Sequence, residues 1–181
     1  MALAYSQGMP PGTAAPDFSL PGTDGNMWSL ASFRDAELLV VVFTCNHCPY
    51  AIASEDRLIA LHTRFAPRAR FVLINPNDET AYPDDSFDAM VRRARDKDFP
   101  FPYVRDASQA IARAYDAACT PDIFVFDQSR ALRYNGRIDD NWQHPEAVTR
   151  RDLETVLEDL LAGHGISITP VPSMGCSIKW K

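Results

Sequence analysis

Two nearly unbroken apolar runs stand out in the first half of the chain. Residues 37–44 read ELLVVVFT and residues 70–74 read RFVLI, a pattern typical of strands that are covered on both faces. Between them, apolar residues recur at helical spacing from Ile52 to Phe65, and Pro67 ends the pattern. The first half therefore predicts a strand, a helix and a second strand, which together form a βαβ unit.

The second half predicts two helices, a pair of strands and a final helix. Apolar side chains fall at positions i, i+3, i+4 and i+7 over residues 87–94 and again over 111–118, which indicates two amphipathic helices. Residues 122–127 and 131–134 are strand-like and only a short polar turn separates them, so we expect an antiparallel pair. A last apolar stripe runs over residues 153–161 and ends near Gly163.

The two ends of the chain differ from this core. Residues 1–36 are rich in Pro, Gly, Ser and Thr, and a turn at residues 22–25 predicts a hairpin within this N-terminal extension. Residues 163–181 form a Pro-containing tail whose apolar side chains predict that it folds back onto the domain or onto a neighbour. The order of elements predicts one α/β domain over residues 1–181, with a core at 37–162 and a mixed central sheet flanked by helices.

Composition narrows the setting in which this domain works. The chain has 181 residues, 46% of them hydrophobic, which is enough to bury roughly 70% of the unfolded surface in one core. The net charge of -6 provides no basic surface, so we expect neither nucleic acid nor membrane as a partner. No signal peptide or membrane-spanning run is evident, and the expected compartment is the cytoplasm. Cysteines in a reducing compartment serve catalysis, metal binding or packing more often than disulfide frameworks.

Cys45 and Cys48 form a C-x-x-C pair where the first buried strand gives way to the helix. The start of a helix offers unpaired N–H groups and the positive end of the helix dipole, which favour a thiolate at Cys45. Two cysteines at this spacing can alternate between a dithiol and a disulfide, one attacking a substrate disulfide and the other resolving the mixed disulfide. We therefore predict that Cys45 is the nucleophile and that Cys48 is the less exposed, resolving thiol.

His47 lies between these cysteines, and when protonated it would stabilise the thiolate and raise the reduction potential. Pro49 directly follows Cys48. Since proline fits only the first turn of a helix, we expect a late helix start or a kink there. The same pair could instead be two buried thiols or half of a zinc site. Zinc needs two further ligands, and the single cysteines Cys119 and Cys176 are far apart in sequence, so neither a metal nor another cofactor is expected.

Two segments at strand ends add candidate site residues. Thr120 and Pro121 stand just before the strand at 122–127, and we predict that their peptide bond is cis and faces the cysteine pair, which would also bring Cys119 near the site. Residues 75–78 follow the second strand and predict a turn, although strand ends in an open α/β sheet can also border a site.

These residues resemble the redoxin branch of the thioredoxin superfamily, which includes the alkyl hydroperoxide reductase and thiol-specific antioxidant proteins. The resemblance covers about residues 12–162 and is carried by residues 12–21 (GTAAPDFSLP), 45–50 (CNHCPY) and 119–122 (CTPD). Together with the ending GCSIKW at 175–180, these motifs resemble a sparsely characterised group of bacterial thioredoxin-like proteins. The resemblance implies a thioredoxin fold with a helix and a strand inserted at about residues 76–105. It also implies that Thr120 and Pro121 form the loop that aligns a substrate chain beside the sulfurs.

The expected function is that of a thiol-disulfide oxidoreductase acting on protein or small-molecule disulfides and thiols, with a separate thiol electron donor. A thiol peroxidase is the first alternative, but the P-x-x-x-T-x-x-C spacing of peroxiredoxins is missing around both cysteines of the pair. A metal-binding chaperone is the second, since thiolates suit Cu(I) and zinc. Thr44 also stands where thioredoxins usually have a tryptophan.

Cys119 and Cys176 are possible accessory thiols. For Cys176 two roles compete: a small buried side chain that fixes the tail, and a third redox thiol that exchanges with the Cys45–Cys48 disulfide or with Cys119.

Overall fold

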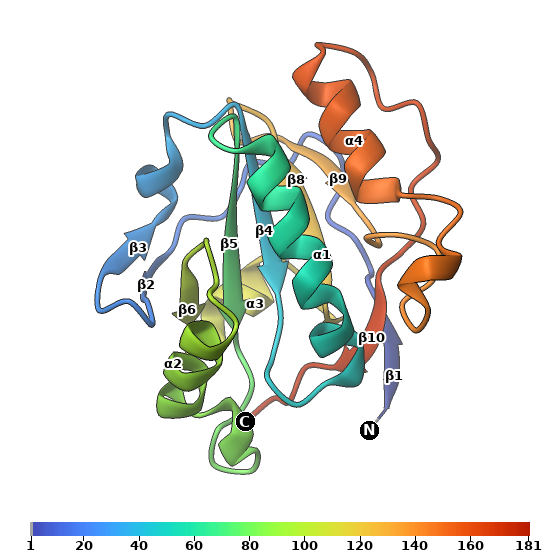
Figure 1. Cartoon of the computed structure of the whole chain (residues 1–181). Coiled ribbons are helices and arrows are strands. Elements are labelled where there is room, and N and C mark those ends of the chain that lie inside the picture. Colours follow the sequence, from blue (N-terminus) through green and yellow to red (C-terminus); the bar gives the residue numbers. More distant parts are fainter. Residues whose placement is uncertain (1) are drawn as a thin grey trace.

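The structure, a computed structural model that describes residues 2–181, has a five-stranded central sheet in that part of the chain, with helices on both faces (Figure 1). The strand order is β6-β5-β4-β8-β9. The central strands β4, β5 and β6 run parallel, and β8 and β9 continue the sheet in antiparallel orientation. The bounds are β4 (Leu38–Phe43), β5 (Ala69–Asn75), β6 (Tyr103–Arg105), β8 (Asp122–Phe126) and β9 (Leu132–Asn135).

Alternation of side chains along β4 explains why both faces of the sheet are covered. Leu39, Val41 and Phe43 join one apolar cluster, while the intervening Leu38, Val40 and Val42 join a second cluster on the opposite face. Helices α1, α2 and α4 lie over the second cluster and α3 over the first, as Figure 1 shows. Their bounds are α1 (Pro49–Phe65), α2 (Phe87–Asp96), α3 (Ala110–Ala114) and α4 (Asp152–Leu161). Single 3-10 turns occur at η1 (Leu30–Phe33), η2 (Pro83–Asp85) and η3 (Pro145–Ala147).

The two ends of the chain meet beside the sheet. Strand β10 (Met174–Ser177) pairs with β1 (Leu3–Tyr5) on one side and with β7 (Cys119–Thr120) on the other, both antiparallel. Figure 1 shows β1 and β10 side by side near the start of α1. A separate hairpin joins β2 (Ser19–Pro21) to β3 (Met27–Ser29). The tail therefore folds back onto the domain, as predicted, and it does so as a strand that the sequence pattern did not predict.

The βαβ unit, the N-terminal hairpin, the β8–β9 pair and the inserted α2 and β6 all confirm predicted elements. The helix expected over 111–118 is wrong in its extent, because α3 ends at Ala114. Asp116 adopts a positive φ of 49° and Ala117 N–H donates to Ala112 O, a closing bond that stops the helix. None of the helices among the described residues is both long and apolar enough to cross a membrane.

Candidate active site

Cys45 and Cys48 meet in the reduced form between the end of β4 and the start of α1. Both are almost fully buried, with exposed fractions of 2% for Cys45 and 0% for Cys48, so the predicted contrast in exposure is very small. Both sulfurs contact Thr120: Cys45 Sγ lies 3.3 Å from its hydroxyl, and Cys48 Sγ lies 3.0 Å from its carbonyl oxygen. The two elements that sequence reasoning singled out therefore form one site.

The Thr120–Pro121 bond is cis, which confirms the prediction for this loop. Cys119 comes near the site, as expected, but its thiol points elsewhere: its sulfur contacts the carbonyl oxygens of Pro121 at 3.4 Å and Ser173 at 3.8 Å. Burial raises the pKa of the Cys119 thiol, and the negative charge of Asp122 raises it further. Cys119 is accordingly a buried, protonated neighbour of the pair.

The helix begins later than the thiolate argument for Cys45 requires. Its first residue is Pro49, the late start that proline predicted, and its N-cap is Cys48. The N–H of Ala51, in the first turn, therefore lowers the pKa of Cys48, and Cys45 lies outside the helix. The expectation that the helix N-terminus would favour a thiolate at Cys45 is thus wrong, and the reason is the one-turn shift that Pro49 imposes.

Hydrogen-bond donors converge on Cys48. The Cys45 thiol donates to it, which is the largest effect lowering the Cys48 pKa, to about 5; burial opposes this, and the Cys176 thiol, Ala51 N–H and Thr120 hydroxyl lower the pKa further. The carbonyl oxygen of Thr120 accepts only from the protonated thiol. Because four donors face this one acceptor, we place the negative charge of the pair on Cys48.

Cys45 has the opposite environment. Its pKa is raised, first because it donates to Cys48, then by burial, and then by the negative charge of Asp85. When the pair carries one negative charge, that charge therefore lies on Cys48 and the remaining proton lies on Cys45. The hydrogen bond between them is the path by which that proton can move to Cys48.

Asp85 organises the polar side of the site. It is fully buried, and its carboxylate accepts from the Asn46 N–H at 2.7 Å and pairs with His47 Nδ1 at 2.7 Å. The side-chain amides of Asn75 and Asn77 donate to the same carboxylate at 3.2 Å and 2.9 Å. A buried carboxylate with this many donors is held in one position, and it holds the C-x-x-C loop through Asn46 and His47.

His47 is fixed on two sides. Its Nδ1 is paired with Asp85, and its ring stacks on Tyr82 with ring centres 5.1 Å apart and an angle of 8° between the planes. Its Nε2 is buried and has no hydrogen-bond partner within residues 2–181. Asn46 is anchored as well, because Tyr103 donates to its side-chain oxygen at 2.9 Å. The loop that carries Cys45 is thus bound to the main body of the fold.

Cys45, His47 and Asp85 also place one potential metal-ligand atom each within 4.8 Å of one another. A borderline or soft cation such as Zn²⁺ suits the cysteine and histidine atoms. The carboxylate of Asp85 is however already engaged by the donors described above, and these hydrogen bonds account for the close approach.

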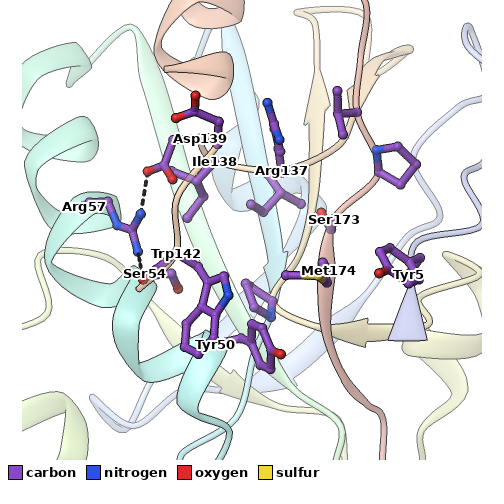
Figure 2. A pocket seen from close by; sticks show the side chains of 15 residues that line it. Tyr5, Tyr50, Ser54, Arg57, Arg137, Ile138, Asp139, Trp142, Ser173 and Met174 are labelled. Atoms are coloured by element: carbon purple, nitrogen blue, oxygen red, sulfur yellow. Dashed lines mark hydrogen bonds and ion pairs between the residues drawn. The ribbon is translucent and has the colours of Figure 1, made fainter. Parts of the chain in front are cut away.

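A cavity of about 180 Å³ opens beside the Pro121 loop. Figure 2 shows Tyr50 and Trp142 next to each other on one side, with ring centres 4.1 Å apart, and Met174 and Ser173 of the tail on another. Arg57 is tied to Asp139 by the ion pair that Figure 2 marks. Tyr50 also packs against the cysteine cluster, so this largely apolar cavity borders the thiol site.

Sequence reasoning found the cysteines, His47 and the Pro121 loop but missed most of the polar side. The position of Asn75 and Asn77 at the end of a buried strand was the one available signal, and they border the site as strand-end residues can. Asp85, Tyr82 and Tyr103 belong to the inserted segment, where no local pattern marked them.

Comparisons with known proteins show the family and the fold of the chain. The profile of the AhpC/TSA family matches residues 11–135. No curated protein matches the chain. An uncharacterised conserved protein from Geobacillus kaustophilus is 38% identical, with a TM-score of 0.95 over 100% of this chain and 97% of that one. A hypothetical protein from Sinorhizobium meliloti is also 38% identical, with a TM-score of 0.93 over 98% of each chain.

A more distant structure shares the fold alone. A thiol:disulfide interchange protein of the thioredoxin family from Chlorobium tepidum is 22% identical, with a TM-score of 0.59 over 70% of this chain and 86% of that chain.

Proposed function

Because the chain belongs to the AhpC/TSA family, we propose that it is a thiol-disulfide oxidoreductase that cycles Cys45 and Cys48 between dithiol and disulfide. The observation that carries this proposal is the contact of both sulfurs with Thr120, in a pair whose mutual hydrogen bonding raises the pKa of Cys45 and lowers that of Cys48. Such a pair needs no metal and no organic cofactor for disulfide exchange.

In the proposed cycle Cys45 is the attacking sulfur. Cys48 is enclosed by donors on several sides, whereas Cys45 lies beside the His47 loop and can pass its proton to the Cys48 thiolate. The Cys45 thiolate then attacks one sulfur of a substrate disulfide, forms a mixed disulfide and releases one substrate thiolate. Cys48 passes its proton to the released substrate thiolate, attacks Cys45 and releases the second substrate thiolate, so the substrate gains two electrons and the protein becomes a disulfide.

The cavity beside Pro121 supports a preference for substrates with an apolar group next to the reacting sulfur. Tyr50, Trp142 and Met174 line it, and apolar surface of this kind favours burial of an apolar or aromatic side chain. The reduction of insulin, a protein disulfide, should therefore be faster than that of glutathione disulfide at equal concentration.

Trapping of the mixed disulfide tests the proposal. The Cys48→Ser variant should accumulate a covalent adduct on Cys45 when mixed with insulin or glutathione disulfide, and both single variants should lose steady-state turnover by at least about 1000-fold. Mass spectrometry after acid quenching locates the adduct. Full turnover in Cys48→Ser would contradict the two-thiol cycle, and an adduct that forms only in Cys45→Ser would reverse the roles.

Hydrogen peroxide consumption with a thiol donor provides the second arm of this test. Peroxide reduction that survives in Cys48→Ser but not in Cys45→Ser would point to a sulfenic acid at Cys45 and against disulfide exchange as the main reaction.

A further inference from the structure

Strand β10 brings a third thiol to the redox pair. Cys176 lies across from Thr120 in the antiparallel pairing of β10 with β7. The preceding Gly175 passes so close that an added Cβ would lie 2.1 Å from the Thr120 carbonyl oxygen. Only a residue without a side chain fits there, which shows how closely β10 lies against the Thr120 loop that contacts both sulfurs of the pair.

Cys48 is the middle sulfur of the resulting group of three thiols. Cys45, Cys48 and Cys176 form one buried cluster with Ala51, and the thiols on either side both hydrogen-bond to Cys48. In thiol-disulfide exchange the attacked sulfur must touch both the incoming and the departing sulfur. Cys48 is the sulfur of this group that touches two others.

Contacts on both sides of Cys176 hold the tail in this place. Ser173 donates its hydroxyl proton to the carbonyl oxygen of Gly136 at 2.7 Å. Beyond Cys176, the Lys179 N–H donates to the side-chain oxygen of Asn77 at 2.9 Å, and the Gln109 amide donates to the Lys179 carbonyl at 2.8 Å. The position of Cys176 is therefore built by the fold and does not depend on a loose chain end.

We propose that Cys176 is a third redox residue, which exchanges with the Cys45–Cys48 disulfide. The Cys176 sulfur attacks the Cys48 sulfur, the Cys45–Cys48 bond breaks, and a Cys48–Cys176 bond forms. The proton of Cys176 moves to the departing Cys45 thiolate. The protein neither gains nor loses electrons in this step, so it needs no further reactant. The inference rests on the proposed function, which supplies the Cys45–Cys48 disulfide.

The exchange frees the attacking sulfur while the protein stays oxidised. In the Cys48–Cys176 form, Cys45 again carries a thiol beside His47 and Asp85, and the disulfide is stored at the tail. In this form Cys45 can attack a second substrate disulfide, form a mixed disulfide and release one substrate thiolate. Because Cys48 is then bound to Cys176, the donor thiol resolves this mixed disulfide. The tail then acts as an internal electron donor to Cys45 in a three-cysteine relay.

Disulfide mapping of Cys45→Ser tests the relay, because this variant keeps Cys48 and Cys176 but cannot form the first disulfide. On mild oxidation with diamide it should lose two of its three alkylatable thiols and yield a Cys48–Cys176 crosslink. The matched control is the double variant Cys45→Ser/Cys176→Ser, which should keep both of its remaining thiols, Cys48 and Cys119. Wild-type protein oxidised in the presence of trace thiol should contain both disulfide isomers.

Two results would overturn the relay. One is a Cys45→Ser protein that forms only an adduct on Cys48 while Cys176 becomes alkylated solely after unfolding; the other is a Cys48–Cys119 crosslink in its place. The single variant Cys176→Ser separates this failure from a failure of the proposed function. If it still forms the Cys45–Cys48 disulfide and turns over, only the relay is lost; if it forms none, the dithiol cycle itself is wrong.

Discussion

The surroundings of Cys45 and of Cys48 differ although the two residues are only three positions apart in the sequence. Cys45 faces a polar network built around the buried Asp85. Its pKa is raised mostly by its hydrogen bond to Cys48, then by burial, and then by the negative charge of Asp85. Cys48 faces thiol, hydroxyl and backbone donors, and its pKa falls to about 5. Donors and acceptors placed by distant segments, more than the C-x-x-C motif itself, therefore decide where the charge lies.

The largest expected effect concerns the acid on the Cys45 side. Asp85→Ala removes the acceptor for the donors of Asn46, Asn75 and Asn77 and for His47, so buried polar groups lose their partner. We expect a loss of about 3–5 kcal/mol in the free energy of unfolding. Urea denaturation measures it.

The neighbouring Asp84→Asn is the matched control, because the Asp84 side chain is exposed and its carbonyl, which accepts from Asn46, is kept. A loss below about 1 kcal/mol in Asp85→Ala would mean that this network does not hold the loop.

The contrast between the two sides also shows what the sequence could and could not predict. Continuous apolar runs at 37–44 and 70–74 located the central strands, and the C-x-x-C spacing located the pair, because these signals are local. Asp85 meets the C-x-x-C loop, and β10 meets the Thr120 segment, only through contacts between segments more than 35 residues apart. No local pattern encodes such contacts.

The helix dipole argument failed for a related reason. The residue types predicted a helix start and a proline that fits its first turn, and both are present. Which of the two sulfurs lies next to the first-turn N–H groups, however, depends on which cysteine becomes the N-cap, and that residue is Cys48. The late start was predicted, but its consequence, that the first-turn N–H groups favour charge on Cys48 and not on Cys45, was not.

The pH dependence of stability is the second test of the comparison. A pKa lowered by folding, as at Cys48, contributes stability that is fully present above the unfolded value near 9 and is lost as the pH falls toward 5. The free energy of unfolding of the reduced protein should therefore rise between pH 6 and 8 by at most about 1.4 kcal/mol per pH unit from this group. Cys48→Ser should lack this contribution.

The profile of Cys48→Ser has to be subtracted from that of the wild type because Asp122 also titrates in this pH range. Burial raises its pKa to about 7, so its contribution is present below the unfolded value and is lost as the pH rises through 7, opposite in sign to that of Cys48. Since both proteins keep Asp122, subtraction of the two urea-denaturation profiles removes it. Parallel profiles for wild type and Cys48→Ser would place the thiolate elsewhere.

A methyl group on the tail should disturb the Cys48 side selectively. Gly175→Ala sets a Cβ against the Thr120 carbonyl, where backbone has to move, and we expect a loss of about 1–3 kcal/mol together with a higher Cys48 pKa. Gly165→Ala adds the same atom to the same tail, where nothing lies within 4 Å, and should be close to neutral. Equal effects of the two substitutions on thermal unfolding would show that the close β10–β7 contact carries no energy of its own.

The smallest expected effect isolates one hydrogen bond to Cys48. Cys176→Ala removes a donor from the thiolate, so the pKa of Cys48 should rise by about one unit, which corresponds to about 1.4 kcal/mol. Cys176→Ser keeps a hydroxyl that can donate to the same sulfur and should restore most of the shift, although neither variant can form a Cys48–Cys176 disulfide. The absorbance of the thiolate at 240 nm, followed across pH in reduced protein, measures the midpoint. A rise of equal size in both variants would assign the shift to packing of the tail, and no rise in either would leave Cys45, Ala51 and Thr120 as the donors that set the charge.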